Sequence, residues 1–123
     1  LVPIVIDGCL RNKEIPCSDG LQFRDFLFID DFVELIKKIL KKNNNINGIY
    51  NVGFGKPNKV KDIINFIQKK IKKGKPIFGR IPMRNEEMKF TYPNISKIKK
   101  NYNWRPQIKI NVGLKKTINF YAK

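Results

Sequence analysis

The sequence contains no histidine, and this absence removes the side chain that most often serves as a general base in enzymes. A Ser–His–Asp triad and a Cys–His pair both need an imidazole, so neither can be assembled within this chain. Cysteine is also scarce, with Cys9 and Cys17 as the only two. Two thiols without histidine are too few ligands for a zinc site. We expect free thiols in a cytoplasmic protein, with a disulfide between them as the alternative.

Acidic residues are few: the chain has 10 Asp and Glu against 26 Lys and Arg, a formal net charge of +16. Such a charge is typical of proteins that bind nucleic acids. We favour a lysine-rich proteome as its cause, because the lysines fall in pairs on the polar faces of expected helices and Asn and Ile are abundant. A nucleic-acid partner is therefore not expected, although a basic surface would attract an anionic substrate.

Long apolar runs are missing too. None approaches the roughly 20 residues of a membrane-spanning helix, so no membrane partner is expected. The first residues, Leu1-Val-Pro-Ile-Val-Ile, have neither a basic leader nor an initiating Met. We therefore expect no signal peptide, and we expect the chain to be part of a longer protein. Residues 1–123, of which 41% are hydrophobic, are expected to form a single partial domain.

Hydrophobic spacing predicts strands and helices in alternation. Strands are expected at 26–29, 49–52 and 76–78, and helices at 32–40, 59–72, 94–102 and 111–121, with a turn at 43–48. Asp30 or Asp31 would cap the first of these helices, and Gly74 would end the second. This order indicates an α/β fold. Three short strands cannot cover all the helices, so we expect further strands outside this chain.

Two motifs favour structural roles. Gly53-Phe-Gly55 is similar to part of a dinucleotide-binding loop, but the third glycine at the required spacing is absent, so we interpret it as a turn. Asp25, Asp30 and Asp31 could form a metal cluster. We favour a structural interpretation, because an expected strand separates Asp25 from Asp31, and the latter two acids suit the start of a helix.

Several aromatic residues stand among lysines. Phe90, Tyr92 and Tyr102 could stack on the bases of a single-stranded nucleic acid, but we favour core packing for them. Trp104, the single tryptophan, is expected to be a core residue at the end of a helix.

Two arginines border short apolar stretches: Arg24 in Gln22-Phe-Arg-Asp-Phe-Leu-Phe-Ile-Asp-Asp31, and Arg84 in Arg84-Asn-Glu-Glu87. The planar guanidinium fork of arginine can hold a phosphate in two places. Glu86 and Glu87 would diverge on an extended segment. We therefore expect them to pair with Arg84, or to accept a hydrogen bond from a sugar hydroxyl, rather than to act as an acid/base pair.

These arginines belong to an ordered set of motifs that spans the chain. The set comprises Leu1-Val-Pro3, residues 22–31, Gly48-Ile-Tyr-Asn-Val-Gly53, Arg84 with Glu87, Ser96-Lys97, Asn103-Trp-Arg-Pro106, Val112-Gly-Leu114 and Thr117-Ile118. In this order the chain resembles the C-terminal, substrate-binding part of the extended short-chain dehydrogenase/reductase family, the NAD(P)-dependent sugar-nucleotide epimerases and dehydratases. Residues 78–84 are most similar to the branch that makes deoxysugar nucleotides, including CDP-abequose synthase-like reductases.

The resemblance implies an extended Rossmann-type fold, a nucleoside diphosphate sugar as substrate, and a homodimer. It implies that Arg24 and Arg84 hold the diphosphate, that Glu87 contacts ribose or sugar hydroxyls, and that Gln22 belongs to the same substrate site. NAD or NADP would be bound mainly by an N-terminal portion, since the sequence has no glycine-rich NAD(P) loop and no Tyr-x-x-x-Lys pair. These residues alone are therefore expected to be inactive. The alternative is a basic nucleic-acid-binding module.

Overall fold

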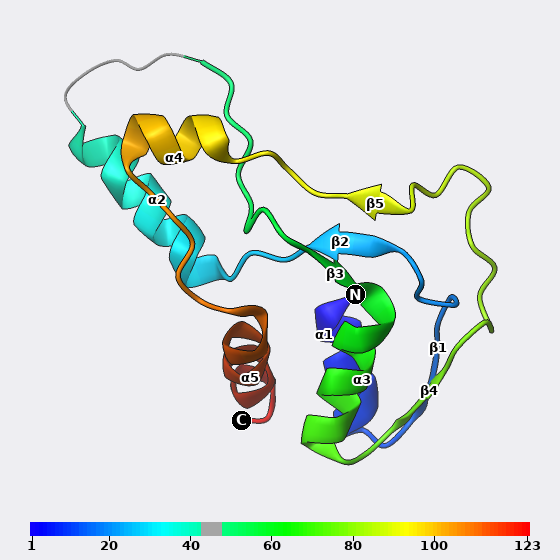
Figure 1. Cartoon of the computed structure of the whole chain (residues 1–123). Helices are drawn as coiled ribbons and strands as arrows, with labels where there is room; N and C mark the ends of the chain where they lie inside the picture. Colours follow the sequence, from blue (N-terminus) through cyan, green and yellow to red (C-terminus); the bar gives the residue numbers. More distant parts are fainter. Residues whose placement is uncertain (43–47) are drawn as a thin grey trace.

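The computed structural model describes residues 1–42 and 48–123, in which helices alternate with short strands (Figure 1). In chain order the elements are α1 (Val2–Leu10), β1 (Glu14–Pro16), β2 (Phe23–Asp25), α2 (Ile29–Lys41), β3 (Pro57–Lys59), α3 (Val60–Ile71), β4 (Lys75–Ile77), β5 (Phe90–Thr91), α4 (Ser96–Tyr102) and α5 (Ile110–Tyr121). The predicted α/β class is confirmed. No helix in the described residues has the length and apolar character of a membrane span.

Within the described residues, the strands form two small sheets. β1 pairs with β4 in parallel, and β2 lies between β3, to which it is antiparallel, and β5, to which it is parallel. Phe23 stands opposite Lys59 on one side and Phe90 on the other. The central strand β2 therefore fixes the relative positions of segments that are far apart in the sequence.

Helices α1, α3 and α5 enclose the larger apolar core. Its buried side chains are Val5, Ile6 and Cys9 from α1, Ile15 and Cys17 from the β1 segment, Val60, Ile63, Ile64 and Ile67 from α3, and Leu114 and Ile118 from α5. Helices α1 and α3 lie side by side, flanked by β1 and β4 (Figure 1). Burial of each large aliphatic side chain stabilises the fold by about 1.5–3 kcal/mol.

A smaller core joins α2 to α4 and contains Leu35, Ile95, Ile98 and Trp104. Trp104 is only 2% exposed, which confirms the prediction of a core residue. Its indole Nε1 donates a hydrogen bond to the carbonyl oxygen of Asp31 at 3.1 Å. The carboxylate of Asp31 accepts bonds from the backbone N–H groups of Gln107 and Ile108, at 2.9 Å each. This buried acid therefore ties α2 to the segment before α5.

The strand predictions were partly wrong. Residues 26–29 are not a strand, because the residues that find hydrogen-bonding partners are Phe23–Asp25, and Ile29 already begins α2. Residues 49–52 are not a strand either, since the partner of β2 is Pro57–Lys59. The third expected strand is confirmed with a shift of one residue, at Lys75–Ile77.

The predicted helices are present in the structure, but several of their ends differ from the predicted residues. α1 was not predicted, although Pro3 lies in its first turn, where proline is tolerated. The N-cap of α2 is Phe28 rather than either aspartate, and α3 ends at Ile71 with Lys72, in the left-handed conformation, as its C-cap in place of Gly74. The expected turn at 43–48 lies outside the described residues except for Gly48. The prediction that Phe90 and Tyr92 pack in the core was wrong, because each of the two residues is 51% exposed.

Candidate functional site

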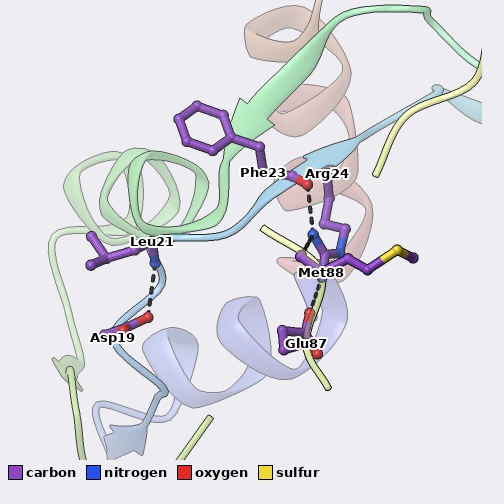
Figure 2. A network of polar contacts seen from close by, with 6 residues as sticks. All are labelled: Asp19, Leu21, Phe23, Arg24, Glu87 and Met88. Carbon is purple, nitrogen blue, oxygen red and sulfur yellow. Dashed lines mark hydrogen bonds and ion pairs between the residues drawn. The ribbon is translucent and has the colours of Figure 1, made fainter. Parts of the chain in front are cut away.

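Arg24 lies in the middle of β2, and backbone and side-chain acceptors hold its guanidinium. Nη1 donates hydrogen bonds to the carbonyl oxygens of Phe23 at 2.7 Å and Met88 at 2.9 Å. Nη2 forms an ion pair with the carboxylate of Glu87. Figure 2 shows Arg24 reaching toward Glu87 and Met88, while the ring of Phe23 points to the opposite side of the strand. The fork is thus fixed on one face of the sheet.

The strand pairing explains how Glu87 reaches Arg24. Phe23 donates its backbone N–H to the carbonyl oxygen of Lys89 at 2.7 Å, just before β5 begins. A turn precedes this contact, in which the N–H of Glu87 bonds the carbonyl oxygen of Arg84 at 3.0 Å. The turn presents Glu87 to β2. The side chains of Arg24 and Glu87 remain 26% and 23% exposed, so a ligand in solution can reach the pair.

Gln22 and Arg24 line the same cavity, of about 420 Å³. Its other lining residues are mainly apolar: Leu1, Ile4, Val5, Ile15, Pro16, Cys17, Ser18, Val60, Ile64 and Ile81. Within the described part of the chain, the side-chain oxygen of Gln22 is buried without a hydrogen-bond partner. The cavity therefore combines apolar walls with one glutamine and one arginine.

Arg84 is exposed and lines a separate cavity of about 390 Å³ with Asn85, Glu86 and Glu87. Within the described residues, no hydrogen bond or ion pair holds its guanidinium. The expected pairing of Glu87 with Arg84 was wrong, because Glu87 pairs with Arg24. The structure thus joins Arg24 to Glu87 and places Gln22 in the same cavity as Arg24, whereas Arg84 lines a separate cavity with Glu87.

Asp25 has a structural role, as predicted, but its partners were not foreseen. Its Oδ2 accepts hydrogen bonds from the backbone N–H groups of Phe54 at 2.7 Å and Gly55 at 3.2 Å. A Cβ at Gly53 would lie 2.1 Å from that oxygen and 2.4 Å from Cγ of Pro93, so the loop needs glycine there. The signal available in the sequence was the acid directly after Arg24, together with the glycine-bearing turn at 53–55.

The loop Gly53-Phe-Gly55 does not fit a dinucleotide phosphate. The amides of Phe54 and Gly55 already bond the carboxylate of Asp25, whose negative charge would repel a phosphate. The interpretation of this motif as a turn agrees with the geometry.

Cys9 and Cys17 are free, as predicted, and both are buried. Burial raises the pKa of both thiols above the ordinary value of 9.0, and the nearby charge of Cys17 raises that of Cys9 further. The thiols are therefore neutral at pH 7, and Cys17 contributes an apolar surface to the cavity beside Gln22.

Comparison with known proteins agrees with the motifs. Residues 1–53 match the NAD dependent epimerase/dehydratase family. CDP-abequose synthase of Salmonella muenchen is 33% identical over 122 residues, which cover 97% of this chain and 41% of that enzyme. The chain is a homologue of the sugar-nucleotide epimerases and dehydratases. The resemblance inferred from the sequence is thereby confirmed.

Two further relatives extend the comparison. UDP-glucuronate 4-epimerase of Thermodesulfobacterium geofontis is 38% identical over 105 residues, covering 84% of this chain and 31% of that enzyme. The crystal structure of UDP-glucuronic acid 4-epimerase from Bacillus cereus, in complex with UDP-glucuronic acid and NAD, is 27% identical, with a TM-score of 0.85 over 97% of this chain and 38% of that one. The 123-residue chain spans only about two fifths of the length of CDP-abequose synthase.

Proposed function

We propose that this chain holds the nucleoside diphosphate of a sugar nucleotide, as the substrate-binding part of an NAD(P)-dependent epimerase, dehydratase or 4-ketoreductase. Such an enzyme would serve the synthesis of deoxysugars or of precursors of cell-surface polysaccharides. The site consists of Gln22, Arg24, Arg84 and Glu87.

The observation that carries this proposal is the placement of Arg24. Its guanidinium stands at the edge of an apolar cavity and is oriented by two carbonyl oxygens and the carboxylate of Glu87. A preorganised arginine binds a phosphate with less loss of side-chain entropy than a free one. Charge-assisted hydrogen bonds to a diphosphate would each contribute roughly 1.5–3 kcal/mol.

The cavity beside Arg24 supports a nucleoside as the group attached to the phosphates. Its volume of about 420 Å³ lies within the range of small-molecule sites, and its walls are apolar, as a base ring requires. Gln22 lines this cavity, and its side-chain amide would bond an N–H group of the base or a hydroxyl of the ribose once it turns toward the ligand.

NAD or NADP would supply hydride transfer in the enzyme that we propose. The loop at Gly53 does not fit the cofactor, because its amides are bonded to Asp25. The residues of this chain therefore bind and orient substrate, and we expect no turnover of a sugar nucleotide by the 123 residues alone. A homodimer is expected from the family resemblance, and light scattering would measure it.

Calorimetric titration of the chain with UDP, CDP and free uridine tests the proposal. We expect binding of the diphosphates and much weaker binding of uridine. Arg24→Ala should weaken diphosphate binding about tenfold to a hundredfold. Arg105→Ala removes the same charge from an exposed position that lines a different cavity, and should leave the affinity unchanged. Equal affinity of Arg24→Ala and the wild type, both folded, would contradict the proposal.

One observation favours a second candidate function, binding of single-stranded nucleic acid. The rings of Phe23 and Phe90 stack with centroids 4.7 Å apart, and the ammonium groups of Lys59 and Lys89 lie 5.8 and 5.9 Å from their centroids. Exposed aromatics beside lysines can stack on bases. Tight, steeply salt-dependent binding of oligothymidylate that Phe90→Ala abolishes would favour this function over sugar-nucleotide binding.

A further inference from the structure

We propose that Asp25 is a positioning residue: its carboxylate clamps the loop 53–55 against the ends of β2 and β5, and thereby fixes Arg24 beside Glu87. The consequence for ligand binding rests on the proposed function, but the effect on Arg24 does not.

The first part of the clamp is a pair of hydrogen bonds that Asp25 accepts from residues that belong to no helix or strand. Oδ2 of Asp25 accepts from two consecutive backbone N–H groups, those of Phe54 and Gly55, at 2.7 and 3.2 Å. An ionised carboxylate makes stronger bonds to amides than a neutral acceptor does. The loop is therefore held to the last residue of β2, directly after Arg24.

Close packing completes the clamp. Gly53 is buried between Asp25 and Pro93, and the position of a Cβ on Gly53 would overlap both. Pro93 follows β5, which pairs with β2 through Phe90 and Thr91. The same contact therefore fixes where β2 ends and where the chain leaves β5.

The position of Arg24 depends on both strands. Its own backbone belongs to β2, whereas its acceptors Glu87 and Met88 stand just before β5. A slip between the two strands would separate the guanidinium from these acceptors. Misplacement of a binding group by about 1 Å commonly costs a large factor in function. Because successive side chains of a strand point to opposite faces, Asp25 thus supports Arg24 from the other face of β2.

Four variants test this role: Asp25→Ala, Asp25→Asn, Gly53→Ala and the control Asp62→Ala. Asp25→Ala removes the acceptor, and Gly53→Ala displaces it sterically. Asp25→Asn keeps a side-chain oxygen for both N–H groups and should therefore keep Arg24 in its wild-type position. Asp62→Ala removes a carboxylate from the exposed first turn of α3. Circular dichroism establishes which variants fold.

The first readout needs no ligand. In nitrogen–proton spectra, the Nε–H resonance of Arg24 should shift or broaden in Asp25→Ala and Gly53→Ala. It should stay in place in Asp25→Asn and in Asp62→Ala. A purely structural role for Asp25 would lower stability without moving this resonance, so an unchanged Arg24 signal in the folded Asp25→Ala or Gly53→Ala variant overturns the proposal.

The second readout is the affinity for inorganic pyrophosphate. We expect a loss of about fivefold or more in Asp25→Ala and Gly53→Ala, and wild-type affinity within about twofold in Asp25→Asn. If Asp25→Ala does not fold, Gly53→Ala and Asp25→Asn carry the comparison. Wild-type affinity in a folded Gly53→Ala variant would overturn the proposal. Failure of the wild type itself to bind pyrophosphate or UDP would instead contradict the proposed function, and the resonance of Arg24 would still decide the role of Asp25.

Discussion

Arg24 and Glu87 form an ion pair across 63 residues of sequence, and this pair is the link between the two arginine motifs. Arg24 also bonds the carbonyl oxygens of Phe23 and Met88, so three of its five N–H donors are engaged before any phosphate arrives. A diphosphate at this place would have to share the guanidinium with Glu87 or displace it. Glu87 therefore orients the arginine and competes with the anion at the same time.

Glu87→Gln separates these two effects. The variant removes a negative charge beside the proposed anion site and frees part of the guanidinium. We expect inorganic pyrophosphate to bind about 1.4-fold to fivefold more tightly, which corresponds to an ion-pair free energy of about 0.2–1 kcal/mol. Calorimetry with pyrophosphate and with UDP measures both ligands. A smaller gain for UDP would show that the carboxylate also contacts the nucleoside, whereas weaker pyrophosphate binding would contradict competition.

The role of Arg84 can be tested by measuring stability and ligand affinity in the same variant. Its side chain is exposed and forms no ion pair within the described residues, so Arg84→Ala should change the free energy of unfolding by less than about 0.5 kcal/mol. If Arg84 holds the diphosphate with Arg24, the same variant should weaken UDP binding by about tenfold. Arg105→Ala is the charge-matched control. Loss of stability without loss of affinity would assign Arg84 a structural role.

The helices could be predicted more completely than the strands, for a physical reason. In α3 the apolar residues Ile63, Ile64 and Ile67 recur at the helical period, and this local pattern determines the buried face. Each strand has only two or three residues, and its bounds depend on a partner elsewhere in the chain. The apolar run at 26–29 was therefore mistaken for a strand, while its neighbours 23–25 found the partners.

The same distinction holds for the candidate site. Arg24, Arg84 and Glu87 were found because they stand in motifs that can be read locally. The pairing of Glu87 with Arg24 and the clamp of Asp25 on Phe54 were missed, because both depend on which strands lie next to β2. Short-range sequence pattern identifies residue types suited to a ligand, but the register of a sheet decides which of them meet.

The buried thiols predict a pH dependence of stability. Burial raises the folded-state pKa of Cys9 and Cys17 above 9.0, so the folded state favours the neutral thiols. This contribution to stability is fully present below the unfolded pKa and is lost as pH rises through the raised folded pKa. Chemical denaturation should therefore show stability falling above about pH 9. In the double variant Cys9→Ala/Cys17→Ala, the free energy of unfolding should fall less steeply with pH. A pH profile identical to that of the wild type would contradict the role given to the two thiols.

Asp31 and Asp30 form a matched pair for the last prediction, since both are aspartates in the first turn of α2. Asp31 is 4% exposed and accepts hydrogen bonds from the N–H groups of Gln107 and Ile108, whereas Asp30 is exposed and pairs with Lys116 at 3.1 Å. Asp31→Ala would leave two amides without their acceptor, at a cost of about 1–3 kcal/mol for each group that stays buried. Asp30→Ala removes an exposed ion pair worth about 0–1 kcal/mol.

Urea denaturation followed by tryptophan fluorescence suits the measurement, because Trp104 bonds the carbonyl oxygen of Asp31. Equal midpoints for the two variants would show that Asp31 does not tie α2 to the chain before α5, and that the smaller core holds these segments together by packing alone.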